Sequence, residues 1–309
     1  MKYLFITISL SVLCVCESCF SQPKQIEVTY STNSNNEYSF QSKNLNFCDY
    51  TVKIEFQNLQ NATSSSSLPY IESISSGINT LFTLKPSQTG QNISFQFGYK
   101  SQKGRLLSKP PKSFIYLLPF SNQSKHRIND SQNIMEMVSG KKVNNFYGLS
   151  FQMKKGDTVF AARRGIVSEL KDEYDRYNDG VWFSSQTNFV EVFHQDGTFA
   201  RYNRLKKGGI LVKEGQNIEA GQALGIVADD TFEGATVAQL MIYYLSKTNA
   251  FVEAKHSYDY VKPIFYTKDR PEGKFLEQGE SYVSEWAESV VTQEMSKREI
   301  KKWREGKGK

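Results

Sequence analysis

Few side chains in this sequence are of the types that catalyse reactions or bind metals. The 309 residues include three histidines, His126, His194 and His256, which lie far apart along the chain and are expected to be ordinary surface or hydrogen-bonded residues. A catalytic zinc needs three imidazole or carboxylate ligands and an open position for water. The adjacent Asp229 and Asp230 could attract a hard cation, although a solvated loop is the commoner setting for such a pair. We therefore assign no metal and no cofactor.

The elements that would have to position any site are strands. Residues 146–280 are rich in β-branched and aromatic residues, and glycines punctuate the predicted strands at Gly156, Gly197, Gly215 and Gly221. A residue without Cβ enters positive φ freely, so these positions predict sharp turns between strands. Any β-rich domain needs such turns, and biotin- and lipoyl-carrier folds share the spacing of the last two glycines. The carriers also need a lysine at a hairpin tip, and the sequence has no convincing candidate.

Three segments of this domain resemble the lysostaphin-type, or LytM-like, zinc endopeptidases that cut peptidoglycan cross-bridges. They read KGDTVFAARRGIV at 155–167, FHQDGTFARYNRL at 193–205 and VKEGQNIEAGQALGI at 212–226. The resemblance implies a barrel-sandwich hybrid β domain with the duplicated hybrid motif. A weaker resemblance, carried by YGLSF at 147–151 and NFCDYTV at 46–52, is to Bacteroidetes-type exported proteins in which a β domain precedes the peptidase domain.

The same resemblance implies where zinc ligands and catalytic histidines should stand, and the residue types there are unsuitable. The aspartate, the histidine of the Tyr-x-His-Leu stretch and the two histidines of the last core strand correspond to Ser150, Arg204, Gln239 and Met241. The remaining histidine should lie near Gly140 or Phe146. A neutral hydroxyl does not replace a carboxylate, and a permanent guanidinium cation repels zinc. We therefore expect a domain that has lost catalysis.

The vacated cleft suggests a binding role. Five side chains are expected to line it: Tyr202, Arg204, Gln239, Tyr243 and Tyr244. Aromatic faces combined with amide and guanidinium donors suit the recognition of glycans or peptides. The alternative is that these residues are packing and solvent-facing positions of ordinary strands.

The N-terminal part of the chain predicts an exported protein. Residues 1–21 have the pattern of a secretory signal peptide, and three of the four cysteines lie inside it. Lipidation of one of these is an alternative that their bulky or acidic neighbours disfavour. Cys48 would then be alone, which excludes an intramolecular disulfide. We expect no transmembrane segment in the mature chain and a location in the periplasm or at the outer membrane.

The rest of the chain predicts a second domain and a tail. Alternating apolar and polar residues at 26–30, 52–56 and 93–99 indicate half-buried strands, so residues 22–120 are expected to form an immunoglobulin-like β-sandwich. The polar stretch 121–145 is expected to be a connector. Residues 281–309 have helical spacing and a basic end, which predicts a charged C-terminal helix that docks onto a partner or is simply solvated.

Composition and motifs together leave three functions open. The net charge of +6 and the basic tail suit an anionic envelope polymer or an acidic protein surface, and nucleic acid is not an expected partner of an exported chain. The favoured hypothesis is a non-catalytic envelope protein that binds peptidoglycan or scaffolds and regulates an envelope complex. The alternatives are an active zinc metallo-endopeptidase that cleaves peptidoglycan peptides and a structural subunit of an outer-membrane or secretion complex.

Overall fold

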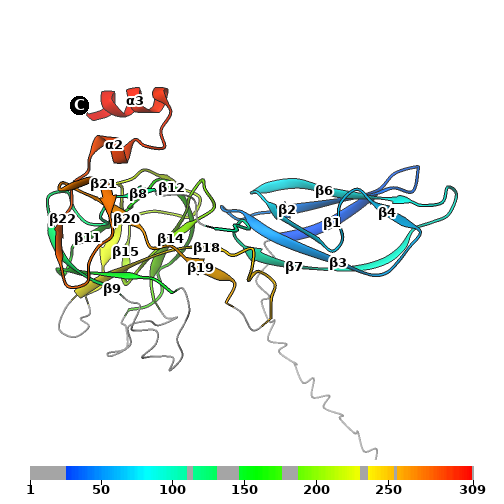
Figure 1. Cartoon of the computed structure of the whole chain (residues 1–309), viewed down its shortest axis with the longest axis horizontal. Helices are drawn as coiled ribbons and strands as arrows, with labels where there is room; N and C mark the ends of the chain where they lie inside the picture. The colour runs from blue at the N-terminus through cyan, green and yellow to red at the C-terminus, as the bar shows by residue number, and fades with distance from the viewer. Residues whose placement is uncertain are drawn as a thin grey trace, which may run out of the picture.

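The structure is a computed structural model, and it describes residues 26–109, 114–130, 146–175, 187–229, 236–253 and 256–307. The predicted signal peptide lies outside these residues. Most of the described chain is β-strand, as the sequence predicted, and two short helices lie close to its C-terminal end (Figure 1). No helix within the described ranges is long and apolar enough to cross a membrane.

The N-terminal domain consists of two antiparallel sheets that share one apolar core (Figure 1). One sheet has the order β1 (Ile26–Thr32), β2 (Tyr38–Asn44), β6 (Gly77–Pro86), β4 (Ala62–Ser64), and the other has the order β5 (Tyr70–Ile74), β3 (Tyr50–Gln60), β7 (Ser94–Lys103). Phe40 from the first sheet and Ile54 from the second are fully buried between them. The predicted alternation of buried and exposed residues is present in these strands, whereas the immunoglobulin-like topology stays a prediction.

The second domain contains one long sheet and two small sheets of three strands each. The long sheet has the order β16 (Asn217–Ile218), β12 (Gly165–Lys171), β13 (Phe189–Phe193), β14 (Phe199–Asn203), β18 (Thr236–Leu245), β10 (Leu149–Met153), β9 (Lys125–Asp130), β22 (Ser281–Val283), with β19 (Tyr258–Tyr260) paired to β18. The small sheets are β11 (Thr158–Phe160), β17 (Ala223–Val227), β15 (Leu205–Ile210), and β21 (Arg270–Lys274), β20 (Ile264–Thr267), β8 (Ile115–Tyr116). The main core of the domain draws residues from all three sheets.

The two faces of the long sheet differ, because side chains alternate across a strand with period two. Phe151, Leu240 and Tyr202 point into the core that the long sheet shares with the small sheet β11–β17–β15. Ser150 and Gln239 therefore lie on the opposite face. We call this opposite face the cleft face, since it carries the strand positions where the resemblance places metal ligands.

The first domain ends earlier than the sequence predicted, and the predicted connector contains a strand. Leu118 and Phe120 are buried in the second domain. The strand β8 pairs in parallel with β20, and β9 pairs with β10. Sequence reasoning missed these strands because β8 has only two residues and β9 is polar, so neither shows a clear alternation of its own. The partner of β8, and the second partner of β9, which is the strand at residues 281–283, come from distant parts of the chain.

The C-terminal tail contains a helix, as predicted, but the helix begins later than the sequence pattern suggested. Residues 281–283 form β22, which pairs with β9, and they are followed by α2 (Glu288–Val291) and α3 (Lys297–Lys307). The apolar residues that mimic a helical stripe therefore come from a strand and a short helix. Trp286 packs against Gly221 and Phe160 of the second domain, so the tail lies on that domain.

Candidate functional site

The structure brings several of the sequence-predicted ligand positions together on the cleft face. Ser150 on β10 is paired in register with Gln239 on β18, and Gln239 is paired on its other side with Asn203 on β14. Residues directly opposite each other in antiparallel strands have neighbouring side chains. Met241 lies two residues further along β18 on the same face, opposite Arg201. Ser150, Gln239, Asn203 and Met241 therefore lie on one face of the sheet.

This cluster is polar and buried. Ser150 is 0% exposed, Gln239 is 3% exposed and Asn203 is 3% exposed. The Ser150 hydroxyl has no hydrogen-bond partner among the described residues. A buried polar group without a partner costs free energy, so such groups tend to mark sites where something else binds or where function tolerates strain.

Arg204 follows β14 in an unusual backbone conformation. Its φ is 66°, in the left-handed region that residues with a side chain seldom adopt. The backbone is held on both sides, because the amide donates to the Thr187 hydroxyl at 3.3 Å and the carbonyl accepts from the Ala228 amide at 2.8 Å. The residue is 5% exposed, so a permanent positive charge lies inside the domain at the position of a family histidine.

These residues do not fit a zinc ion. Zinc in proteins is bound by imidazole nitrogen, thiolate or carboxylate, whereas this cluster offers a hydroxyl, two amides and a guanidinium. Within the described ranges, no three histidine, cysteine, aspartate or glutamate residues are grouped closely enough to hold a metal. Of the two positions considered for the remaining histidine, Gly140 lies outside the described residues and Phe146 is 6% exposed, next to Tyr260.

The expected lining of the cleft needs correction at two of its five residues. Tyr202 is completely buried on the core face, where its hydroxyl accepts a hydrogen bond from the Ala162 amide at 2.8 Å. Tyr244 is also on the side of β18 opposite to Gln239, and it is 5% exposed. Both are therefore placed by strand alternation to pack rather than to bind. Gln239 and Tyr243 do lie on the cleft face.

Sequence reasoning missed the charged groups of the cleft face. Glu191 on β13 is 1% exposed and accepts hydrogen bonds from the Ser168 hydroxyl at 2.8 Å and from the Tyr243 hydroxyl. Burial works to raise the pKa of Glu191, but the ammonium of Lys103 and these hydrogen bonds hold it below its usual value. The available signal was a single glutamate inside the otherwise apolar strand FVEVF.

A second group on this face is a stacked arginine. The Arg201 guanidinium lies 3.5 Å from the centre of the Phe189 ring, and its Nε donates to the Asn203 side-chain oxygen at 3.1 Å. Stacking of this kind fixes the plane of a guanidinium and leaves its outer edge for a carboxylate or carbonyl. Arg201 is half-buried and adjoins the cluster of Ser150, Gln239 and Asn203 through its pairing with Met241.

The three histidines lie apart from the cluster. His126 contacts the Gln152 carbonyl and the Ser124 hydroxyl, and exposed His256 contacts the Tyr258 carbonyl. His194 is more unusual than expected, because it is 0% exposed and its Nδ1 lies 2.8 Å from the Arg164 carbonyl.

Asp229, the member of the acidic pair that lies within the described ranges, forms two ion pairs. Its carboxylate lies 2.9 Å from the Lys206 ammonium and 3.5 Å from that of Lys155. These contacts hold its pKa below the usual value, the Lys206 hydrogen bond being the largest cause. Asp230 lies outside the described residues.

Comparison with known proteins finds several solved structures that are similar to this chain. Three similar solved structures are a peptidase M23 from Pseudomonas aeruginosa (13% identity, 70% of this chain and 87% of that chain, TM-score 0.26), Csd3 from Helicobacter pylori (12%, 90% and 84%, 0.30) and a zinc-containing peptidase from Vibrio cholerae (14%, 71% and 75%, 0.26). At these TM-scores the structures carry no inference about this chain. No curated protein has a significant match to it.

The family assignment rests on the sequence of the second domain. The model of peptidase family M23 matches residues 144–253. This range contains β10 to β18, and with them Ser150, Arg204, Gln239 and Met241. Residues 144–253 of this chain are a domain of peptidase family M23.

Proposed function

We propose that this chain is an exported cell-envelope protein whose M23 domain binds a cell-wall or protein ligand without cleaving it. The observation that carries the proposal is the register of β10, β14 and β18, which gathers Ser150, Gln239 and Asn203 on the cleft face where metal ligands would be needed. Each of these side chains is neutral and is a poor ligand for zinc.

The charge of this region also argues against a metal. The Arg201 guanidinium lies next to the cluster, where its Nε donates to the Asn203 side-chain oxygen, and a guanidinium stays protonated at any physiological pH. A divalent cation placed beside Arg201 would be repelled by it, and the Glu191 carboxylate on this face is already paired with Lys103. An anionic or carbonyl-rich ligand would be attracted by the same guanidinium.

The groups that remain suit peptide recognition. Amide and hydroxyl side chains both donate and accept hydrogen bonds, as the backbone of a peptide does, and the stacked Arg201 presents a planar donor edge. The peptide stems of peptidoglycan and extended segments of envelope proteins both offer such groups. Export, with residues 1–21 as its signal, and a location in the periplasm or at the outer membrane belong to the proposal.

The test uses the full mature chain, purified without added metal. Elemental analysis should find far less than one zinc per chain, and incubation with purified peptidoglycan should release no new amino groups. Stoichiometric zinc together with cleavage would overturn the proposal in favour of an active peptidase.

A second measurement identifies the kind of ligand. Sedimentation with insoluble peptidoglycan should remove the protein from solution if the wall is the ligand, and an Arg201→Gln variant should then remain soluble. Affinity purification from native envelope should recover a stable protein partner if the chain acts as a scaffold. Absence of both interactions would contradict a binding role.

A further inference from the structure

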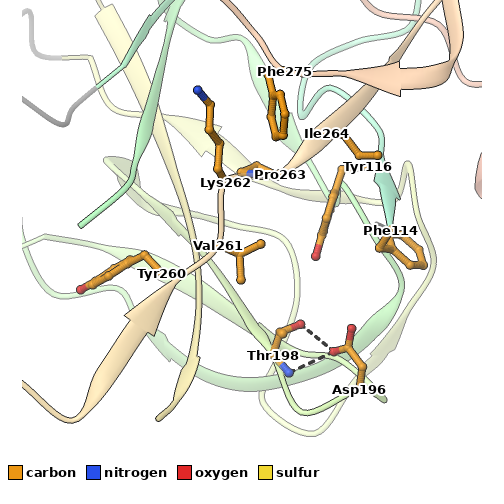
Figure 2. Close-up of a pocket in the computed structure, with 10 residues that line it drawn as sticks. All are labelled: Phe114, Tyr116, Asp196, Thr198, Tyr260, Val261, Lys262, Pro263, Ile264 and Phe275. Atoms are coloured by element: carbon orange, nitrogen blue, oxygen red, sulfur yellow. Dashed lines mark hydrogen bonds between the residues drawn. The ribbon is translucent and has the colours of Figure 1, made fainter. Parts of the chain in front are cut away.

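A second candidate binding site is a cavity of about 290 Å³ that we call the aromatic pocket, and it includes none of Ser150, Gln239 and Asn203. It is formed where β8 and β20 meet the start of β14 and the segment after β19. Four of its lining residues define its walls: Tyr116 and Phe114 on one side, Val261 and Tyr260 on the other (Figure 2). Tyr116 is 3% exposed and its ring lies against Phe114 with the ring centres 5.1 Å apart.

The size of the aromatic pocket limits what it can hold. An apolar cavity of about 150 Å³ accommodates a benzene ring, and sites for drug-sized ligands begin near 300 Å³. The aromatic pocket lies between these values, so it fits one large apolar side chain with a few attached atoms. A chain of several sugars or an extended peptide would not fit inside it.

One end of the pocket carries a carboxylate whose charge is already compensated. Asp196 accepts hydrogen bonds from the Thr198 amide at 3.0 Å and the Thr198 hydroxyl at 2.6 Å (Figure 2). Its other oxygen accepts from Arg163 at 2.6 Å, and the Arg163 guanidinium is itself buried against the Phe114 ring at 3.7 Å. Asp196 therefore creates no demand for a cationic ligand.

The other end carries a cation without a carboxylate partner. Lys262 is exposed, and its ammonium lies 5.0 Å from the centre of the Phe275 ring and 5.6 Å from that of Tyr147. In the part of the chain that the structure describes, Lys262 forms no ion pair. Phe275 is 50% exposed, so this end of the pocket is open to solvent (Figure 2). The aromatic pocket thus combines apolar walls with one uncompensated positive charge at its mouth.

We propose that the aromatic pocket binds the carboxyl-terminal residue of a partner polypeptide. The apolar side chain of that residue lies between Tyr116 and Val261, its terminal carboxylate contacts the Lys262 ammonium, and the preceding chain leaves through the mouth beside Phe275. A peptide terminus satisfies all three features together, because it is the one place on a polypeptide where a carboxylate and an apolar side chain share a single Cα. None of the proposed contacts is made by Ser150, Gln239 or Asn203, so this proposal does not depend on whether the M23 domain binds a metal.

The test measures fluorescence anisotropy of N-terminally labelled hexapeptides of sequence GSGSGF and GSGSGL, each made with a free carboxyl terminus and with a terminal amide. The free acids should bind, and amidation should weaken binding about tenfold, the usual size of a lost charge-assisted hydrogen bond. The Lys262→Gln variant should bind acid and amide alike, at the weak level of the amide.

Two further variants complete the experiment. Lys268→Gln, which removes an equally exposed charge in the turn that follows β20, should keep the full preference for the acid. Phe275→Ala should weaken both peptides, and because Phe275 is half exposed the fold should be retained. Equal binding of acid and amide by the unchanged protein, or no binding of either free acid, would overturn the proposal. Binding of free N-acetylphenylalanine as tightly as the hexapeptide would replace the polypeptide partner with a small amphipathic acid.

Discussion

Lys103, at the end of β7 in the N-terminal domain, forms an ion pair with Glu191 on β13 of the M23 domain. The Glu191 side chain is 1% exposed and that of Lys103 is 18% exposed, so the pair is largely removed from water. Lys103 also contacts Glu169 at 2.5 Å. The two domains are therefore joined by charges that lie between them, on the same sheet face as the cleft cluster.

Replacing Lys103 with methionine should strongly destabilise the protein. The change leaves Glu191 buried without its counter-charge, and breaking a buried pair from one side typically costs about 3–5 kcal/mol. Urea unfolding followed by circular dichroism measures the loss. Lys100→Met on the same strand removes an exposed charge and should change the free energy of unfolding by less than about 0.5 kcal/mol.

The double variant Lys103→Met with Glu191→Gln should recover part of that loss, because it no longer buries an isolated charge. Strict additivity of the two single changes would contradict the ion pair as the source of the effect.

Stability should fall as the pH is lowered, through His194. Burial, aided by the charge of Arg163, lowers the pKa of His194 to about 3 from its ordinary value of 6.5. Between pH 6.5 and pH 3 His194 binds a proton in the unfolded chain but not in the folded protein. The contribution of neutral His194 to folding stability is therefore fully present above pH 6.5 and is lost as the pH falls. The expected slope from this group is about 1.4 kcal/mol per pH unit between pH 6 and pH 4.

The measurement is the free energy of unfolding in urea at several pH values, compared with that of His194→Gln. The variant lacks the imidazole, so its slope should be smaller by about one proton between pH 6 and pH 4. Glu191, whose pKa is also held low by a nearby cation despite its burial, is present in both proteins. Parallel slopes in the two proteins would show that folding does not lower the pKa of His194.

Arg163 should hold the C-terminal tail onto the M23 domain. Its guanidinium, 3% exposed, contacts the two carboxylate oxygens of Glu294 at 2.5 and 3.1 Å. Arg163→Met would remove the buried counter-charge of this carboxylate and of Asp196 and should cost about 3 kcal/mol. The tail should then be released, which limited proteolysis detects as faster cleavage within residues 281–307.

Arg270→Met is the matched control for this change, because its ion pair with Glu272 is 3.4 Å long and fully at the surface. Exposed pairs contribute about 0–1 kcal/mol, so the rate of tail cleavage should stay the same. Equal proteolysis of both variants would mean that packing of Trp286, and not Arg163, retains the tail.

Restoring the family residues should restore metal binding. Ser150→Asp, Arg204→His, Gln239→His and Met241→His together introduce one carboxylate and three imidazoles, and they remove the Arg204 guanidinium. The variant should retain up to about one zinc per chain after dialysis, measured by elemental analysis. A control with histidines at the exposed Gln57 and Gln60 of β3 should retain far less. Failure of the variant to bind zinc would mean that the missing first histidine is indispensable.

The sequence was sufficient for the fold of the M23 domain because strand alternation and turn glycines are local properties. Gly156, Gly197, Gly215 and Gly221 all have positive φ, as the turn argument required. The sequence was less successful where a strand owes its existence to a distant partner, as β8 and β9 do. It also overestimated the helix at the C-terminal end, because apolar spacing at 283–291 has the same appearance whether one or two elements produce it.

Some features of the candidate site could be predicted from the sequence and others could not. Residue types alone determined that Ser150, Arg204, Gln239 and Met241 are unsuitable for zinc, since the chemistry of a ligand belongs to the side chain. Only the tertiary structure decided which neighbours share a face. It moved Tyr202 and Tyr244 away from the cleft, brought Lys103 of one domain onto Glu191 of the other, and assembled the aromatic pocket from four separate segments. Such contacts depend on long-range packing, and neither composition nor spacing along the chain predicts which distant residues will meet.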